Sequence, residues 1–307
     1  MSNSKAILDH AYRIGIVIPS FNVPFLPIMQ PVCRACVDED VMAFVAVARV
    51  EWEKFEAQGP AAIKGQYDEI AADPSVRDHV RLHLDHVPVI DEDNLDVDYR
   101  PIIEKALSLG FDSVMIDGSR LSLEENIRVT REIADLAHGS EVPVEAELGA
   151  VYGHEEGPPP PYEELFQSKR GFTDPEDARR FVAESSCDWL SVAFGSIHGA
   201  VSAALRDQKK PAARLDLEHL QKLVTATRIP LVLHGGSGIT KEYLLPAFQA
   251  GVAKMNIGTE IRQAYTNALR ETDSIEAAQE AVYARARYLL KDYLEISGSR
   301  RHFEDVL

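Results

Sequence analysis

The run IPLVLHGGS, residues 229–237, is a short apolar segment that stops at a histidine and two glycines. Its Val, Ile and Leu content is typical of a parallel strand that is buried on both faces. Seven more runs of this kind recur along the chain: RIGIVIPSFN (13–22), VMAFVAVAR (41–49), HVRLHLDH (79–86), DSVMIDGS (112–119), VPVEAELG (142–149), DWLSVAFGS (188–196) and VAKMNIGT (252–259). Helical patterns such as DPEDARRFVAESS separate them, and several begin at Asp, Ser or Thr and stop at Gly. This α/β alternation predicts a (β/α)₈ TIM barrel rather than a doubly wound sheet.

The barrel accounts for most of the 307 residues. We expect a single domain over 1–307, with the barrel at about 6–260 and a C-terminal helical extension at about 261–307. The extension contains EIRQAYTNALRET and IEAAQEAVYARARYLLKDYLEIS. These two helices are expected to pack outside the barrel or against another subunit.

The bulk composition excludes several classes of partner. A formal net charge of −17 leaves no Lys/Arg stripe to offset phosphates, so we expect no nucleic-acid partner. We expect no membrane partner, because no apolar run approaches the roughly 18 residues of a membrane span. With three cysteines and no apolar N-terminal signal segment, the sequence predicts a cytoplasmic location.

Polar residues stand where most of the predicted strands end. Active sites of TIM barrels gather at the carboxyl ends of the strands, so these side chains are expected to meet at one rim. They are Asn22, Asp85, His86, Asp117, Glu147, His198, His234 and Asn256.

The pentapeptide LHLDH, residues 82–86, is ambiguous by itself. Strict strand alternation would turn His83 and Asp85 one way and His86 the other. Alternation relaxes at a strand end, so Asp85 and His86 can both reach the mouth. Together with His198 and His234, His86 would give three imidazoles and an open position, as in catalytic zinc sites. Hydrogen-bonded loop histidines are the alternative.

Glycines follow the last three predicted strands, in GSIHG, HGGSG and NIGT. Backbone N–H groups at this part of a barrel commonly hold a phosphate. Tight turns that need glycine are an adequate alternative for any one of these segments.

Taken together, the motifs resemble those of class II (metal-dependent) ketose-bisphosphate aldolases of the fructose and tagatose type. The resemblance runs from about Ala6 to about Ala264. It is carried, in order, by PSFNV, LHLDH, SVMIDGS, VEAELG, FGSIHG, LVLHGGSG and KMNIGTE.

The resemblance implies a role for each matching residue. His86, His198 and His234 would hold the catalytic divalent metal, normally zinc. Asp85 would act on the proton of the C4 hydroxyl, and Glu155 would exchange the C3 proton. Asp117 and Glu147 would hold the metal in an alternative position. The residues that would bind substrate are Asn22, Gly199, Gly235, Gly236, Ser237, Asn256 and Thr259.

The implied reaction is the reversible cleavage of a phosphorylated ketose to dihydroxyacetone phosphate and an aldehyde, within carbohydrate metabolism. A monovalent cation is a second cofactor to consider, and a homodimer or homotetramer is the expected assembly. Without a lysine Schiff base, a cation must stabilise the enediolate, and two carboxylates must serve C4 and C3. Segment 152–171 would close over the site, or would be a simple surface loop.

Two segments depart from the family pattern. After the second strand, Ala48 or Arg49 replaces a serine, with Glu51 and Trp52 following, and AVSAALRD follows GSIHG. We expect Arg49 to bind a polar or anionic group at the far end of the substrate, because a guanidinium suits such groups. In the alternative, Arg49 pairs with Glu51 or Glu53 outside the site.

Two other functions use the same residues. A metal-dependent hydrolase could activate water with the three histidines and Asp85, and would not need Glu155. A sugar-phosphate-binding protein could keep the fold without turnover, although an intact Asp85 and Glu155 argue against this.

Overall fold

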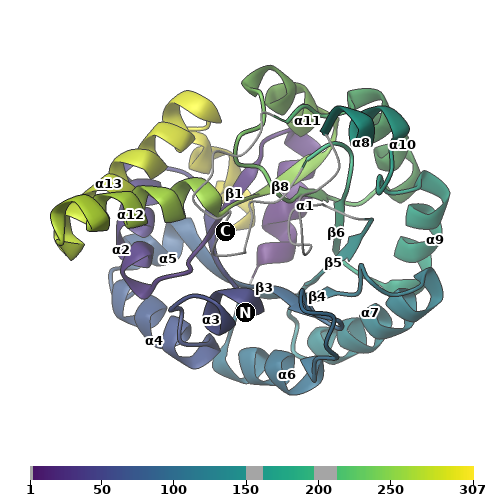
Figure 1. The fold of residues 1–307 in the computed structure, drawn as a ribbon, viewed down its shortest axis with the longest axis horizontal. Coiled ribbons are helices and arrows are strands. Elements are labelled where there is room, and N and C mark those ends of the chain that lie inside the picture. The colour runs from purple at the N-terminus through teal and green to yellow at the C-terminus, as the bar shows by residue number, and fades with distance from the viewer. Residues whose placement is uncertain (1–2, 150–161, 197–212) are drawn as a thin grey trace.

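The computed structural model describes residues 3–149, 162–196 and 213–307. Eight parallel strands form a closed barrel in sequence order, and β1 pairs with β8 to complete the ring (Figure 1). The strands are β1 (Ile18–Asn22), β2 (Ala43–Ala48), β3 (Val80–Pro88), β4 (Ser113–Asp117), β5 (Val144–Leu148), β6 (Trp189–Val192), β7 (Leu231–Leu233) and β8 (Val252–Ile257). The predicted (β/α)₈ barrel is confirmed.

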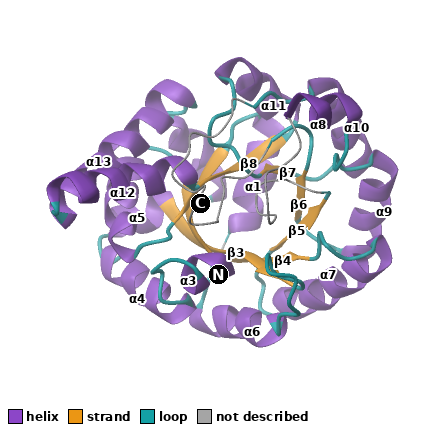
Figure 2. Ribbon diagram, viewed as in Figure 1, coloured by secondary structure: helices purple, strands orange, loops and turns teal. Residues whose placement is uncertain are grey.

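Helices surround the strands on all sides (Figure 2). They are α1 (Ser4–Ile14), α2 (Met29–Asp38), α3 (Arg49–Glu53), α4 (Pro60–Ile70), α5 (Pro74–His79), α6 (Tyr99–Leu109), α7 (Leu123–His138), α8 (Tyr162–Ser168), α9 (Pro175–Ser185), α10 (Leu217–Thr227), α11 (Leu244–Ala250), α12 (Thr259–Thr272) and α13 (Ile275–Tyr288). Short 3₁₀ turns lie at Leu26–Ile28, Lys241–Tyr243 and Ser299–Val306, and a π turn at Leu289–Tyr293. In the part of the chain that the structure describes, no helix combines the length and apolar character needed to cross a membrane.

Several helices begin at the side-chain caps that the sequence indicates. Ser122 and Glu125 form a capping box at the start of α7. The Asp174 carboxylate accepts from the amides of Glu176 and Asp177 at the start of α9, and Asp216 accepts from the His219 amide at α10. Each cap satisfies amides that have no partner within the helix, so the sequence itself sets where these helices begin.

The barrel interior changes character along its axis. At the amino end, α1 and the turn Ser299–Val306 close the base, where Leu8, Phe44, Trp189 and Phe303 belong to one apolar cluster. Nearer the carboxyl ends of the strands the interior becomes polar and holds the fully buried Lys254, among other charged groups. Polar groups in such a place must be paired with one another, so this layer can position a site above it.

The C-terminal helices lie outside the barrel. α12 and α13 pack against each other, and α13 packs on α2 (Figure 1). Because α12 starts at Thr259, directly after β8, its first turn lies at the rim of the barrel.

Candidate active site

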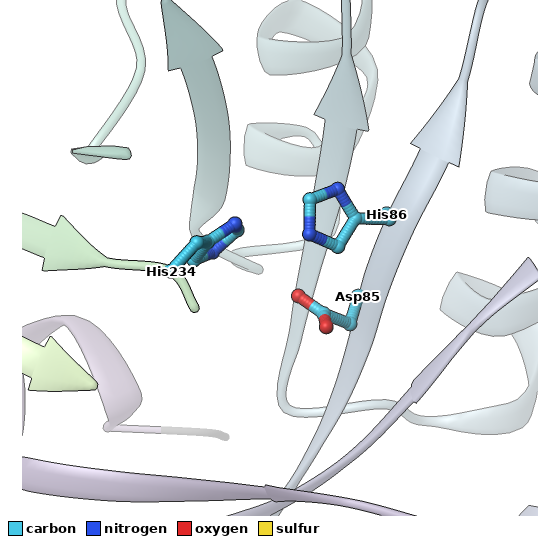
Figure 3. A group of neighbouring side chains, drawn as sticks. All are labelled: Asp85, His86 and His234. Carbon is cyan, nitrogen blue, oxygen red and sulfur yellow. The ribbon is translucent and has the colours of Figure 1, made fainter. Parts of the chain in front are cut away.

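A β-bulge in β3 places two adjacent functional residues at the mouth. Leu84 pairs with Val114 and Val87 with Ile116, so Asp85 and His86 together face one residue of β4. His86 takes a φ of +20°, which breaks the strand alternation. Asp85 and His86 therefore both face His234, which follows β7 (Figure 3).

The two described histidines of the predicted metal site lie together. The ring centroids of His86 and His234 are 4.5 Å apart. His86 Nδ1 lies 2.9 Å from Asp117 Oδ2 and 3.6 Å from Glu147 Oε2, and His234 Nδ1 lies 3.1 Å from the same Glu147 oxygen. Asp85 completes a group with the two histidines whose ligand atoms lie within 4.8 Å of one another. His198, the third predicted ligand, lies outside the described residues.

These donors fit a divalent metal ion. Glu147 Oε2 is buried, and within the described ranges no hydrogen bond of good geometry reaches it, although His234 Nδ1 lies 3.1 Å away. A carboxylate oxygen in that position is poorly satisfied by protein alone, and a cation beside it would satisfy it. Imidazole nitrogen and carboxylate oxygen are the donors that zinc and other first-row divalent metals accept.

The electrostatics of the metal-free site favour positive charge. Burial opposes protonation of His86, but Asp85 and Asp117 outweigh it and raise the pKa of His86 to about 10. For His234, too, burial and the neighbouring His86 lower the pKa, whereas Glu145 and Glu147 raise it, and the net direction is upward. A divalent cation would replace protons on these imidazoles, as metal binding to histidine requires.

Asp85 is held by two asparagine amides. Asn22 Nδ2 donates to Asp85 Oδ2 at 2.8 Å, and Asn256 Nδ2 lies 3.0 Å from both carboxylate oxygens. Burial raises the pKa of Asp85, but the charge of His86 and the hydrogen bond from His83 outweigh it and keep that pKa well below its usual range. Asp85 is thus ionised and fixed in orientation.

A buried polar layer below the mouth was not assigned from the sequence. Glu145 receives the Trp189 indole at 2.6 Å and Lys254 Nζ at 2.7 Å, and its other oxygen lies 2.8 Å from His234 Nε2. Lys254 also donates to Asn256 Oδ1 at 2.8 Å. Through Lys254 the layer connects Glu145, which contacts His234, with Asn256, which donates to Asp85. The sequence does contain a signal for Glu145: the alternation of VEAEL turns Glu145 and Glu147 to the same face of the strand.

His83 belongs to this deeper layer. Its Nδ1 lies 2.8 Å from Ser113 Oγ, and its Nε2 lies 3.5 Å from both Asp85 Oδ1 and Glu145 Oε2. The bulge turns His86 towards the same side of β3 as His83, and the two histidines differ in depth: His83 contacts the buried Glu145, whereas His86 contacts Asp117 and Glu147 at the mouth.

The segments after β6, β7 and β8 offer hydroxyl groups to an anion. The Oγ atoms of Ser196 and Ser237 are buried, with no hydrogen-bond partner among residues of the described ranges. Thr259 opens α12 directly after β8, which is the neighbour of β7 in the ring of strands. Ser196 was not among the residues predicted from the sequence.

Two of the predicted glycines are described. The Gly236 amide donates to Asn256 O at 3.2 Å, and a Cβ there would lie 2.5 Å from the Met255 side chain. Close packing therefore requires this glycine, and its amide is already engaged. Gly235 has a φ of +67°, which favours glycine in the turn. Gly199, like Glu155, lies outside the described residues.

Arg49 is engaged with acidic side chains. Its Nη1 donates to Asp91 Oδ2 at 3.2 Å, and its Nη2 lies 3.9 Å from Glu53 Oε1. Asp91 is itself buried. The expected contact of Arg49 with the substrate therefore competes with this pairing. The alternative partner Glu53 is present, but the main partner is Asp91.

Glu51 instead turns inward. It is 7% exposed, and its Oε2 accepts from the Ala48 amide at 2.7 Å. Burial and the charge of Asp85 raise the pKa of Glu51 to about 8, with burial as the larger cause. The hydrogen bond from the Ala48 amide acts in the opposite direction. Asn22 and His86 lower that pKa, so Glu51 lies in the same electrostatic environment as the catalytic candidates.

Comparison with known proteins decides the family. A family model described as fructose-bisphosphate aldolase class-II matches residues 2–300. The chain belongs to the class-II fructose-bisphosphate aldolase family. It is 30% identical over 267 residues to a fructose-bisphosphate aldolase of Geobacillus stearothermophilus, covering 87% of this chain and 84% of that protein.

Solved structures agree with the family. The YdjI aldolase of Escherichia coli K12 matches with a TM-score of 0.71 and 26% identity, over 94% of this chain and 96% of that one. A fructose-bisphosphate aldolase of Campylobacter jejuni matches with a TM-score of 0.73 and 19% identity, over 96% and 95%. The second likeness supports the fold alone. The predicted enzyme class, a class II aldolase and hence a carbon–carbon lyase, is confirmed, and class II aldolases depend on a metal ion.

Proposed function

We propose that this class II aldolase reversibly cleaves a phosphorylated ketose to dihydroxyacetone phosphate and an aldehyde, with Asp85 as the proton-transfer group for the C4 hydroxyl. The observation that carries the proposal is the position of Asp85. Its carboxylate is buried between the amides of Asn22 and Asn256 and shares a cluster of ligand atoms with His86 and His234.

The metal ligands are proposed to be His86, His234 and His198, with Asp117 and Glu147 as the alternative position. A divalent cation held there, normally zinc, would stabilise the negative charge of the enediolate. Glu145 supports His234 from below, because its Oε1 lies 2.8 Å from Nε2 and so directs Nδ1 towards Glu147.

Two carboxylates then divide the proton transfers. Asp85, held ionised, accepts the proton of the C4 hydroxyl as the C3–C4 bond breaks. Glu155 is proposed to return a proton to C3. In synthesis the same groups act in reverse, so each carboxylate serves one carbon.

The phosphate of the dihydroxyacetone half is proposed to lie after β6–β8. Ser196 and Ser237 present hydroxyls there, and Thr259 opens α12 with its backbone amides. Gly199, Gly235 and Gly236 are the predicted neighbours that leave room for it.

The test is release of dihydroxyacetone phosphate from a panel of ketose phosphates, followed by a coupled dehydrogenase. We expect turnover that disappears after chelation and returns with zinc. A hydrolase would release inorganic phosphate and no dihydroxyacetone phosphate, and a protein that only binds sugar phosphates would show no turnover. Family membership does not favour either alternative.

Two further properties are proposed from the resemblance: a cytoplasmic location and a homodimeric or homotetrameric assembly. The mass in solution, from light scattering of the eluting protein, tests the assembly. A monovalent cation is proposed as an additional cofactor, and turnover in potassium or sodium salts against a tetramethylammonium salt tests it.

A further inference from the structure

Glu51 lies next to the proton-transfer carboxylate. It follows β2, where Ala48 pairs in register with Asp85 of β3, and its carboxylate is anchored to the Ala48 amide. Asn22, which donates to Asp85, also lowers the pKa of Glu51. A second carboxyl group is therefore built into the wall of the site on the β1–β3 side.

The two cations within the segments after β2 and β3 are paired with carboxylates, while Arg120 from the segment after β4 donates to Asn94 and Arg262 of α12 lies over the Phe55 ring. Arg49 donates to Asp91, and Lys54 Nζ lies 3.1 Å from Glu92 and 2.8 Å from Asp93. Segments 49–56 and 91–98 carry these two cations against eight acidic residues, which are Glu51, Glu53, Glu56, Asp91, Glu92, Asp93, Asp96 and Asp98. The rim after β2 and β3 is therefore strongly acidic.

The two halves of the substrate would face different side chains, hydroxyl groups on one side of the barrel and carboxylates on the other. The hydroxyls of Ser196 and Ser237 follow β6 and β7, across the closed ring from β2 and β3. If the phosphate of the dihydroxyacetone half occupies that side, the aldehyde half extends towards the acidic rim. A second phosphate there would face like charges, and such a juxtaposition strongly disfavours a ligand.

We infer that the aldehyde half of the substrate carries no negative charge, being a neutral hydroxyaldehyde or a cationic one, and that Glu51 is the residue that selects it. This rests on the proposed aldolase function and narrows it. In the metal-loaded enzyme, where the cation favours the ionised form, the Glu51 carboxylate would hydrogen-bond a hydroxyl or ammonium group beyond C4 and would repel a phosphate.

The experiment is aldol synthesis from dihydroxyacetone phosphate with three acceptors: glyceraldehyde, 3-aminopropanal and glyceraldehyde 3-phosphate. For the natural chain we expect kcat/KM for glyceraldehyde to exceed that for glyceraldehyde 3-phosphate by about tenfold or more. Glu51→Gln should narrow this ratio by about tenfold. Glu56→Gln, which removes an exposed charge of the same segment, is the matched control and should narrow it much less.

A second variant keeps the inference testable should Glu51→Gln fold poorly. Asp91→Asn removes the charge that holds Arg49, so kcat/KM for glyceraldehyde 3-phosphate should rise relative to glyceraldehyde. Exchange of the C3 proton of dihydroxyacetone phosphate, measured for every variant, shows whether the metal site is intact.

The outcomes are distinguishable. A natural chain that prefers glyceraldehyde 3-phosphate while catalysing exchange and synthesis overturns the inference and leaves the aldolase function standing. An unchanged ratio in both Glu51→Gln and Asp91→Asn also overturns it. Absence of both exchange and synthesis with every acceptor overturns the proposed function and this inference with it.

Discussion

Neutralising Glu51 should stabilise the metal-free protein at alkaline pH. The carboxyl has a pKa of about 8 in the fold, against 4.5 for an ordinary glutamate. Between these two values the folded protein holds a proton that the unfolded chain has released. The free energy of unfolding therefore falls as pH rises from about 4.5 to about 8 and then levels off.

The size of the effect follows from the two pKa values. Each pKa unit corresponds to about 1.4 kcal/mol, so ionising Glu51 in the fold costs on the order of 3–5 kcal/mol at pH 8.5. Glu51→Gln removes this cost, and the glutamine carbonyl can still accept from the Ala48 amide. The variant should be more stable than the natural chain by that amount at pH 8.5, and by no more than about 1 kcal/mol at pH 5.

Urea unfolding of chelator-treated protein at the two pH values measures this difference. Chelation is needed because a bound cation would itself favour the ionised carboxylate. Glu56→Gln, which replaces an exposed carboxyl of the same segment, is again the control. A Glu51→Gln variant whose advantage is the same at pH 5 and pH 8.5 would show that burial does not hold Glu51 protonated.

Three further results are expected at the site. Chelation should abolish activity, and zinc or cobalt should restore it. His198→Ala should lose the metal, whereas His83→Ala should retain it. Equal metal contents in these two variants would contradict the ligand assignment. Asp85→Ala should stop carbon–carbon cleavage while exchange of the C3 proton continues. Glu155→Ala should slow that proton exchange by about 10²-fold or more. The opposite pattern would mean that Asp85 acts on C3 and Glu155 on the C4 hydroxyl. Lys254→Met should lower the free energy of unfolding by about 3–5 kcal/mol, because it leaves a buried carboxylate without its cation; a loss below about 1 kcal/mol in urea unfolding would refute this.

The sequence predicted the barrel well because parallel strands buried on both faces are apolar along their whole length. Each predicted run overlaps an observed strand, although β3 continues beyond its run 79–86 to Pro88 and β7 is only Leu231–Leu233 within the run 229–237. The shortening has a local cause, since the glycines after His234 end the strand pairing and begin a turn.

Contacts between distant segments could not be predicted in the same way. Nothing near Arg49 in the sequence indicates that Asp91, which follows the next strand, would hold its guanidinium. Lys254 similarly gives no local sign of its partner Glu145, three strands away in the ring. The periodicity of a strand states which face a residue occupies, but the partner on that face depends on the closure of the barrel.

The bulge in β3 limits how this site could be transferred to another barrel. Because two residues of β3 oppose one residue of β4, grafting the letters LHLDH onto a regular strand would turn either Asp85 or His86 out of the mouth. A designer would have to copy the extra residue and the +20° φ at His86 along with the side chains. Conversely, deleting one residue between Leu84 and Val87 would restore a regular ladder only by removing Asp85 or His86 itself, so a barrel that still folds would lose either the proposed proton-transfer group or a proposed metal ligand.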